Sequence, residues 1–360
     1  MDKKIRIKDI AKLANVSIGT VDRVIHNRGE VSEQSRKKIM EILEKTGYKP
    51  NLLARTLGSN RTFRIGVLLP NPGQDEYWGL SHEGIRQSEE EWGSYGMIMD
   101  MHNFDLYDKE SFKVHADRAL AAAPDAVIAA PIFYQEAESF FTSCEKAGIP
   151  YVVVNNTIPN TKPLTFIGQD LYQSGRVGAE LLHMHQSPGG TYAILHVYDD
   201  IHNSLHLFEK EKGFKDYFHE RKGDPITVKS LDLNYTHAPT IEKELSELLA
   251  DRNLKGVLVT TSKGASIVSK ILQQNGKKGV RLVAYDLLKE NLGYLNTGII
   301  DFLINQNSRH QSFMGVSLLT NHLLFKRQPA PKYLFALDII TRENLKSYLG
   351  SSIGISTQVR

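Results

Sequence analysis

The sequence contains a single cysteine, Cys144, among its 360 residues. One thiol cannot form an intrachain disulfide or assemble a zinc site made of cysteines. No apolar run reaches the roughly 18 residues that a membrane-spanning helix requires. The charged start of the chain, Met1 to Arg6, lacks the apolar stretch of a secretion signal. We therefore expect a cytoplasmic protein with no membrane partner.

Sequence signatures of common enzymes are also missing. There is no P-loop and no Gly-x-Gly-x-x-Gly motif for a nucleotide. Residues 350–354 fit the pattern Gly-x-Ser-x-Gly, but no His or Asp follows Ser352 to complete a hydrolase triad in the usual order. His202 and His206 stand four residues apart, but no zinc-protease motif accompanies them. We therefore expect neither an enzyme nor a bound metal or cofactor.

Basic charge is concentrated at the start of the chain. Residues 1–63 hold 14 Lys or Arg against 7 Asp or Glu, so this segment is net +7 and the remainder is net −4. A concentrated basic segment is typical of domains that bind nucleic acid. The length of the chain predicts two or three folding units, and the charge assigns polyanion binding to the first of them.

The N-terminal segment has the pattern of three short helices. Apolar residues at helical spacing predict a first helix over Ile7 to Ala14, which Asn15 to Ser17 interrupt. A second helix is predicted from Ile18 to His26 with Ser17 as its N-cap, and a third from Ser32 to Gly47. Two helices joined by a tight turn suit the major groove of DNA, which admits one helix. A basic helical domain that binds a protein, or nothing, would show the same spacing and charge.

The outer side of the second helix offers groups that suit DNA. Burial of its valines leaves Ile18, Gly19, Asp22 and Arg23 outside. The guanidinium of Arg23 suits a bidentate pair with guanine. Phosphate contacts are expected from basic side chains nearby, which are Lys8, Arg28, Arg36, Lys37 and Lys38.

Several stretches of this segment together resemble the headpiece of the LacI/GalR family. They are Ile10-Ala11, Ala14 through Ile25, Val31-Ser32 and Gly47 through Asn51. The resemblance implies that Ile18, Gly19 and Arg23 read bases, with Gly19 contributing only shape or backbone. The implied DNA-facing set is completed by Ser17, Thr20 and Asn27. Asp22 departs from the family, which usually has a phosphate-binding Ser there; an acid would repel phosphate but can orient Arg23 or accept from cytosine.

Residues 50–58 resemble the hinge helix of the same family. The resemblance places Ala54 and Leu57 at DNA, with Leu57 as the leucine that enters a minor-groove step. Such an apolar wedge offsets base unstacking with a kink that lets two headpieces bind at once. The alternative is an ordinary linker leucine that packs on the larger domain.

From Phe63 onward, short apolar runs alternate with helical segments. The runs predict strands at Arg64 to Leu69, Met97 to Met101, Ala126 to Ala130, Tyr151 to Asn155, Thr165 to Gly168, Tyr192 to His196, Ile226 to Leu231, Gly256 to Thr260 and Val280 to Tyr285. Nearly continuous apolar strands followed by helices indicate parallel sheets covered on both faces. The length fits two such sheets.

Polar residues follow these predicted strands, where doubly wound folds bind ligands. They are Asn71, Tyr77, Trp78, Asn155, Asn156, Asp286 and, in a later connection, Gln306. Amides and carboxylates pair with vicinal hydroxyls, and aromatic rings stack on the C–H surface of a sugar. Each residue alone is more often a cap, a turn residue or a core aromatic, but their shared placement favours a binding site.

This part of the chain resembles the periplasmic-binding-protein-like sensor of the same family. Similar segments are residues 166–170, Gly213-Phe214, residues 282–286 and Gly298 leading to Gln306. The resemblance implies ligand contacts at six of the polar residues that follow the strands, which are Asn155, Asn156, Asp286 and Gln306 and then Tyr77 and Trp78. It also implies contacts at two departures from the family, Lys210 in place of Arg and Ser262 in place of Asp. Lys210 keeps a charge but lacks the guanidinium fork, so the effector is expected to differ from common simple sugars.

The expected architecture is an all-α helix-turn-helix domain followed by a two-lobed α/β domain of the type I periplasmic-binding-protein kind. The expected boundaries are 1–49 for the headpiece, 50–61 for the hinge and 62–360 for the sensor, with lobe 1 at about 62–168 and 305–332 and lobe 2 at about 169–304 and 333–360. The expected function is a homodimeric repressor that binds operator DNA under control of a sugar-like effector. A solute-binding protein and a sugar-active enzyme are the alternatives.

Overall fold

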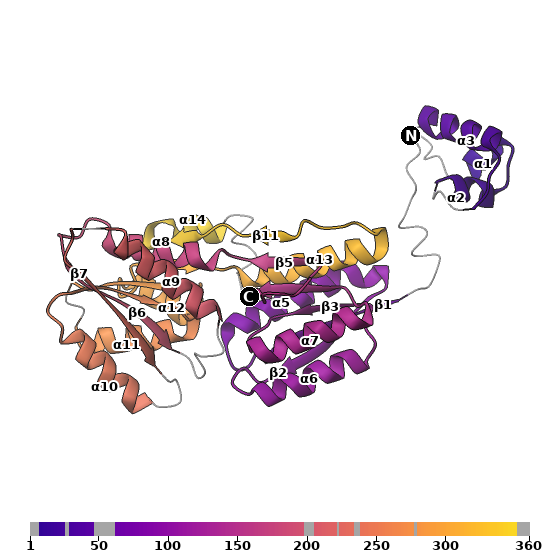
Figure 1. Ribbon diagram of the computed structural model, residues 1–360. Helices are drawn as coiled ribbons and strands as arrows, with labels where there is room; N and C mark the ends of the chain where they lie inside the picture. The colour runs from indigo at the N-terminus through magenta and orange to yellow at the C-terminus, as the bar shows by residue number, and fades with distance from the viewer. Residues whose placement is uncertain are drawn as a thin grey trace. The chain divides into compact units, whose positions relative to one another are not determined.

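A computed structural model describes residues 7–25, 29–46, 62–197, 205–221, 223–233, 238–276 and 279–350. The chain separates into two compact units, residues 1–61 and 62–360 (Figure 1). The described part of the first unit is helical, and the second unit is α/β with two sheets. The predicted fold class is confirmed.

The first unit packs three helices around a small apolar core. They are α1 (Ile7–Ala14), α2 (Ile18–Ile25) and α3 (Glu33–Thr46). Ile10, Val21 and Ile39, one from each helix, are fully buried. Asn15 forms the tight turn between α1 and α2 in the left-handed region, with φ of 56°, which Asn tolerates better than most residues.

The first sheet of the second unit has six parallel strands in the order β11-β5-β4-β3-β1-β2. The strands are β1 (Phe63–Pro70), β2 (Met97–Phe104), β3 (Ala126–Ala129), β4 (Tyr151–Asn155), β5 (Thr165–Gly168) and β11 (Lys332–Leu334). The helices around this sheet are α5 (Glu76–Trp92), α6 (Lys109–Ala121), α7 (Tyr134–Ala147) and α13 (Ser308–Phe325), and η1 (Gly93–Tyr95) is a short 3-10 turn. We call this sheet and its helices lobe 1.

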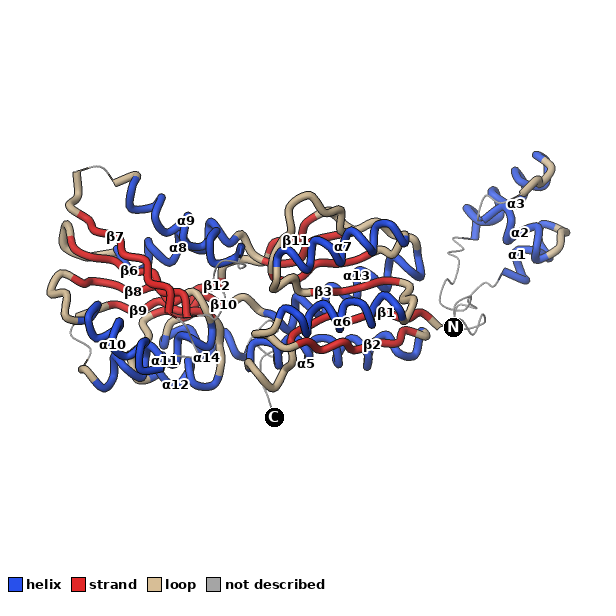
Figure 2. Tube along the Cα trace, turned by 60° about the horizontal axis from the view of Figure 1, so that its bottom comes forward, coloured by secondary structure: helices blue, strands red, loops and turns tan. Residues whose placement is uncertain are grey.

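The second sheet also has six strands, in the order β12-β10-β9-β8-β6-β7. The strands are β6 (Gly190–Val197), β7 (Ile226–Leu233), β8 (Leu254–Val259), β9 (Arg281–Tyr285), β10 (Phe302–Asn305) and β12 (Asp338–Ile340). Its helices are α8 (Leu171–His183), α9 (Leu205–His219), α10 (Ala238–Leu249), α11 (Ser262–Gln274), α12 (Lys289–Asn296) and α14 (Arg342–Gly350). We call this sheet and its helices lobe 2 (Figure 2).

Three short strands were not predicted. These are β10, β11 and β12, and β12 pairs antiparallel with β10, which departs from the expectation of parallel strands alone. β11 and β12 have three residues each, and their mostly exposed or half-buried side chains form no continuous apolar run. The antiparallel pairing lies at the edge of its sheet, after the chain has returned from lobe 1.

The chain passes between the lobes three times. The crossings follow β5, follow β10, and lie between β11 and β12. Two crossing segments are joined directly, since the backbone N–H of Phe335 donates to the carbonyl of Gly168 at 2.8 Å. The second crossing carries Gln306, which lines the cleft described below.

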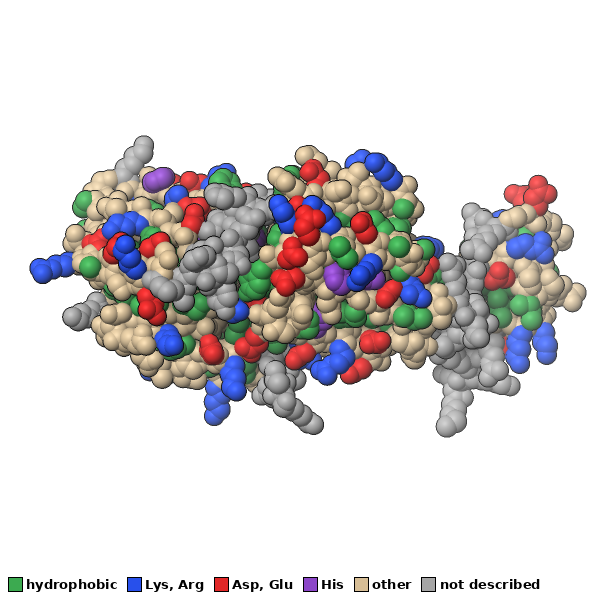
Figure 3. Space-filling model, turned by 90° about the horizontal axis from the view of Figure 1, so that it is seen from below, with side chains coloured by type: hydrophobic (Ala, Val, Ile, Leu, Met, Phe, Trp, Pro, Cys, Tyr) green, Lys and Arg blue, Asp and Glu red, His purple; other side chains and the backbone are tan. Residues whose placement is uncertain are grey.

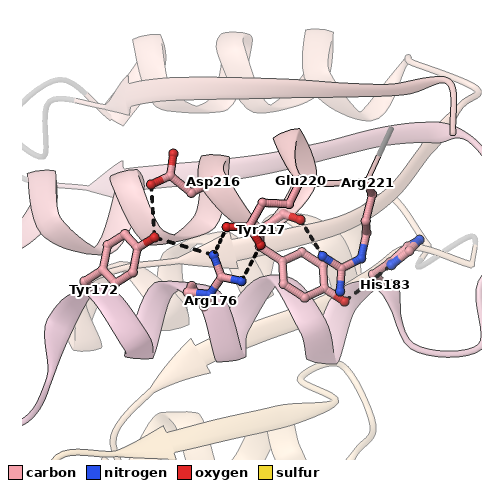
Figure 4. A network of polar contacts seen from close by, with 7 residues as sticks. All are labelled: Tyr172, Arg176, His183, Asp216, Tyr217, Glu220 and Arg221. Atoms are coloured by element: carbon pink, nitrogen blue, oxygen red, sulfur yellow. Dashed lines mark hydrogen bonds and ion pairs between the residues drawn. The ribbon is translucent and has the colours of Figure 1, made fainter. Parts of the chain in front are cut away.

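Helices α8 and α9 of lobe 2 lie too close together for a side chain where they cross. A Cβ added to Gly175 would lie 1.9 Å from the carbonyl oxygen of Lys210, and one on Gly213 would lie 1.9 Å from that of Tyr172. Polar contacts join the same two helices: Arg176 binds both carboxylate oxygens of Glu220, at 2.8 and 2.6 Å (Figure 4). The backbone at Lys210 is therefore positioned by α8.

The visible surface of the second unit mixes charges of both signs. Figure 3 shows Lys and Arg side chains interspersed with Asp and Glu on this face, in contrast to the basic excess of residues 1–63. None of the described helices combines the length and apolar character needed to cross a membrane.

Candidate functional site

The outer side of α2 presents the side chains that the sequence assigned to DNA. Ile18 is 52% exposed, and Gly19 and Arg23 are also exposed. Ser17 caps the helix, because its Oγ accepts from the backbone N–H of Thr20 at 3.1 Å. The Nε of Arg23 donates to the carbonyl of Gly19 at 3.2 Å, which leaves the terminal guanidinium nitrogens for an external partner.

Four predicted DNA contacts lie outside the described residues. They are Asn27, Arg28, Ala54 and Leu57. Asp22 is partly buried and already has an interaction partner. The described face of α2 is therefore formed by Ile18, Gly19 and Arg23, with the hydroxyls of Ser17 and Thr20 joined to each other at 2.9 Å.

A cleft between the two lobes contains most of the predicted ligand contacts. Its lobe 1 side is formed by Asp75, Tyr77, Trp78, Leu106, Tyr107, Ile132 and Asn155. Its lobe 2 side is formed by Val197, His206, Lys210, Thr260, Thr261, Ser262 and Lys263, and Gln306 lies at the crossing. Parallel strands bring these residues together because their carboxyl ends face the same edge of each sheet.

The lobe 1 wall is held by hydrogen bonds around the start of α5. Asp75 caps the helix by accepting from the backbone N–H of Tyr77 at 2.9 Å. The hydroxyl of Tyr77 donates to Oδ1 of Asn155 at 2.8 Å, so the amide nitrogen of Asn155 remains for a ligand. Trp78 meets the Tyr77 ring edge-on, with centroids 4.9 Å apart. Burial raises the pKa of Asp75 to about 6.

The lobe 2 wall is built on Asp286. This residue directly follows β9, in the left-handed region with φ of 67°, and is 2% exposed. Its carboxylate accepts hydrogen bonds from the Ser262 hydroxyl, from the backbone N–H of Gln306 at 2.9 Å and from Nε2 of Gln306 at 2.7 Å. Burial raises the pKa of Asp286, and these three donors oppose the rise. Asp286 thus orders two side chains that line the cleft, Ser262 and Gln306.

Lys210 projects from α9 into the same cleft. Its Nζ donates to the carbonyl of Thr260 at 3.1 Å and lies 3.6 Å from the centroid of the Tyr285 ring. The hydroxyl of Tyr285 is in turn 2.8 Å from that of Ser174, which fixes the ring. Burial lowers the pKa of Lys210 to about 8. A hydrogen bond and a cation–π contact therefore hold the ammonium group deep in the cleft.

His206 lies one turn before Lys210 on α9. Its Nδ1 is 3.2 Å from Nδ2 of Asn156, so the imidazole accepts from the amide and carries its proton on Nε2. Burial lowers the pKa of His206 to about 3, so the ring is neutral at physiological pH. His206 therefore contributes no positive charge to the cleft.

Six of the predicted ligand contacts line the cleft, and three do not. The lining residues are Tyr77, Trp78, Asn155, Lys210, Ser262 and Gln306. Asp286 and Asn156 are buried behind the wall. Asn71 is exposed, and its Oδ1 accepts from the backbone N–H of Gly73 at 2.9 Å, so it forms a turn.

Several lining residues were missed from the sequence. They include Asp75, Tyr107, His206, Thr260 and Lys263. Thr260 and Lys263 follow the end of β8, so the rule that ligands bind beyond the carboxyl ends of strands points to them, whereas Ser262 was assigned only by the family resemblance. His206 was weighed only as a metal ligand; its place in the cleft depends on the packing of α9 against α8.

The chain matches two families of known domains. Residues 65–327 match the periplasmic binding protein domain, and residues 6–51 match the lacI family of bacterial regulatory proteins. These ranges cover most of the second unit and the three helices described in the first.

Relatives of known sequence and structure are similar to this chain over different lengths. The HTH-type transcriptional regulator RegA of Clostridium acetobutylicum is 39% identical over 100 residues, which are 28% of this chain and only 29% of that protein. The sucrose operon repressor of Streptococcus mutans is 28% identical over 94% of this chain and 99% of its own. A Bacteroides fragilis structure described as a LacI transcriptional regulator has a TM-score of 0.74 and 27% identity, covering 80% of this chain and 100% of its own.

Proposed function

Because the chain belongs to the lacI family of bacterial regulatory proteins and carries a periplasmic binding protein domain, we propose that it is a transcriptional repressor controlled by a small polar effector. The observation that carries this proposal is the presence, in one chain, of a helix-turn-helix unit and a two-lobed cleft lined with polar groups. The first unit binds operator DNA, and the cleft binds the effector.

The DNA-binding half of the proposal rests on the exposed face of α2. Arg23 pairs with a guanine edge, and Ile18 and Gly19 contact neighbouring bases in the major groove. Two copies of the chain bind a near-palindromic operator as a homodimer, with half-sites about one helical turn apart. Since its partner is genomic DNA, the protein acts in the cytoplasm.

The effector half rests on the mixture of groups in the cleft. Asn155, Lys210 and Gln306 supply donors and acceptors, and Trp78 supplies an aromatic surface. Such a set suits a small hydroxylated molecule, a sugar or a sugar derivative. Asp286 supports this set from behind by orienting Gln306 and Ser262.

Coupling between the two halves follows from the position of Gln306. Gln306 adjoins Asn305, where the chain crosses between the lobes, and its backbone and side chain both bind Asp286. We propose that an effector in contact with Gln306 changes the angle between the lobes. That change would be passed to the hinge segment, residues 50–61, and would change how readily Leu57 enters the minor groove. The two binding sites are thereby linked by a coupling free energy.

Two other functions share parts of this architecture. Solute-binding proteins have the same two-lobed fold, but a lacI-family domain at residues 6–51 favours a regulator. A sugar-active enzyme is the second alternative, and we propose that the chain is not one. Turnover of a bound sugar by the purified protein would contradict this.

The decisive experiment selects genomic duplexes with the purified full-length protein, at several salt concentrations and with or without a panel of metabolites. We expect a preferred near-palindromic site whose affinity falls steeply with salt. We also expect at least one metabolite to change that affinity. The proposal fails if no duplex is preferred under any of these conditions.

A further inference from the structure

The ammonium group of Lys210 is buried with few partners. Lys210 is 1% exposed, and its Nζ donates one hydrogen bond, to the carbonyl of Thr260. An ammonium group has three N–H donors. Among the described residues, no carboxylate lies within the 4.0 Å ion-pair distance of Nζ. Two of the N–H donors therefore have no acceptor among these residues apart from the face of the Tyr285 ring, and the charge is attracted only from beyond ion-pair distance, by the buried Asp286.

Asp286 does not accept a hydrogen bond from the ammonium group of Lys210, and it does not line the cleft. Its oxygens are occupied by Ser262 and by both the backbone and side chain of Gln306. Ser262 and Gln306 line the cleft, whereas Asp286 lies behind them. A ligand therefore meets a hydroxyl and an amide at this place before it meets the carboxylate.

The lining of the cleft has an excess of positive groups. It contains the ammonium groups of Lys210 and Lys263 and the carboxyl group of Asp75. Lys263 reaches across the cleft to the carbonyl of Gln74 at 3.2 Å, and its charge attracts that of Asp75. With Lys263 and Asp75 offsetting each other, the positive excess among the lining residues is located at Lys210, and the Asp286 carboxylate that attracts it lies behind the lining.

We propose that the effector carries an anionic group, a carboxylate or a phosphate on a hydroxylated frame, and that Lys210 binds this group. Two anionic oxygens accept the remaining N–H donors and neutralise a buried charge, which a neutral hydroxyl cannot do. Hydroxyls of the same molecule bond Gln306 and Asn155. This inference rests on the proposed function and specifies the ligand class of its cleft.

The test compares acidic and neutral sugars on the full-length protein. D-glucuronate is paired with D-glucose and D-galacturonate with D-galactose; D-gluconate and D-glucose 6-phosphate are added, and inorganic phosphate reports binding of an anion alone. We expect thermal stabilisation by an acid or a phosphate and none by its neutral counterpart. The carboxylate and phosphate arms identify which group the cleft takes.

Variants of two lysines on α9 test whether Lys210 is the residue that binds the anionic group. For the ligand so found, Lys210→Met should weaken binding by about 10- to 100-fold in calorimetry, as for loss of a charged hydrogen bond. Lys210→Arg should retain most of the affinity. Lys212→Met removes an exposed lysine two residues away and should change nothing. The melting temperature without ligand checks folding, and replacement of a buried ammonium by methionine is expected to preserve it.

Two outcomes overturn the inference. One is binding of a neutral sugar with an affinity that Lys210→Met leaves unchanged. The other is a panel in which no carboxylate or phosphate stabilises the protein. If a neutral sugar alters operator affinity, the regulator proposal stands while this inference falls. Failure of the regulator proposal appears separately, as the absence of any preferred duplex.

Discussion

The side-chain amide of Gln169 donates a 2.9 Å hydrogen bond to the backbone carbonyl of Asn305. The same nitrogen donates to the carbonyl of Ala336 at 2.8 Å. These three residues belong to the three different segments that connect the lobes. One amide, on a residue only 4% exposed, therefore joins all the crossings at the place where a hinge motion would occur.

Gln169→Ala should destabilise the second unit. The substitution removes both hydrogen bonds and leaves two carbonyls in the hinge without this donor, so we expect the free energy of unfolding to fall by about 1–3 kcal/mol. Urea denaturation of the full-length protein measures the change. Gln173→Ala, on the exposed side of α8, is the matched control and should have an effect within about 0.5 kcal/mol. Equal stability of the two variants would contradict a structural role for Gln169.

Asp75 should make stability depend on pH in a specific direction. Burial raises its pKa from 3.8 to about 6, against the attraction of Lys263 and with repulsion from Asp286 and Glu76. A raised carboxyl pKa contributes stability below pH 4 that is lost as pH rises through 6, because the folded state then holds a buried charge. Relative to Asp75→Asn, the wild type should therefore lose about 2–3 kcal/mol between pH 4 and pH 7.

The comparison with Asp75→Asn isolates this group. Asn keeps the side-chain oxygen that caps α5, so the helix start should be preserved while the titration is removed. Other carboxylates are common to both proteins and largely cancel in the difference. Urea unfolding at pH 4, 5, 6 and 7 gives the two curves. Parallel curves across this range would show that Asp75 does not titrate as inferred.

Gly175→Ala should disturb the position of Lys210. The added Cβ would lie 1.9 Å from the Lys210 carbonyl, and a backbone atom cannot move aside without shifting α9 away from α8. We expect a destabilisation of about 1–3 kcal/mol, together with weaker effector binding. Gly293→Ala in α12 is the control, because nothing lies within 4 Å of its added Cβ. That change should stabilise the helix by about 0.4–1 kcal/mol, and a similar response of both variants would rule out the proposed close contact.

Local apolar runs were sufficient to predict most strands, and polar residues at the ends of those strands were sufficient to predict part of the cleft lining. The strand predicted at Arg64 to Leu69 is β1 with one residue added at each end, because both faces of a central strand are buried. The edge strand β2 extends three residues beyond the predicted Met101, because the half-buried polar residues His102 and Asn103 interrupt the apolar run on which the prediction relied. Asn155, which ends β4, lines the cleft as the rule for parallel sheets requires.

Features that depend on distant segments were not predictable. Gln169 acts as a hinge contact only because residues more than 130 positions away lie beside it. Asp286 was expected to face the ligand, but Gln306 and Ser262 cover its oxygens, which requires knowledge of the crossing after β10. Asn27, Arg28, Ala54 and Leu57 fall outside the described residues, so their DNA contacts stay predictions.

Arg23→Ala should reduce selectivity at one base pair of the operator, rather than weaken binding to every duplex by the same factor. Arg23 is exposed on α2, and its loss should cost about 1–3 kcal/mol on the preferred site and relax selectivity at a single position. Lys37→Ala, exposed on α3, is the matched loss of one positive charge, and as a phosphate contact it should weaken all duplexes alike and reduce the salt slope by about 1. Binding of both variants to a library of operators mutated at each position separates the two effects. If Arg23→Ala weakens every sequence by the same factor, Arg23 contacts phosphate and the base reading must come from other residues of the α2 face.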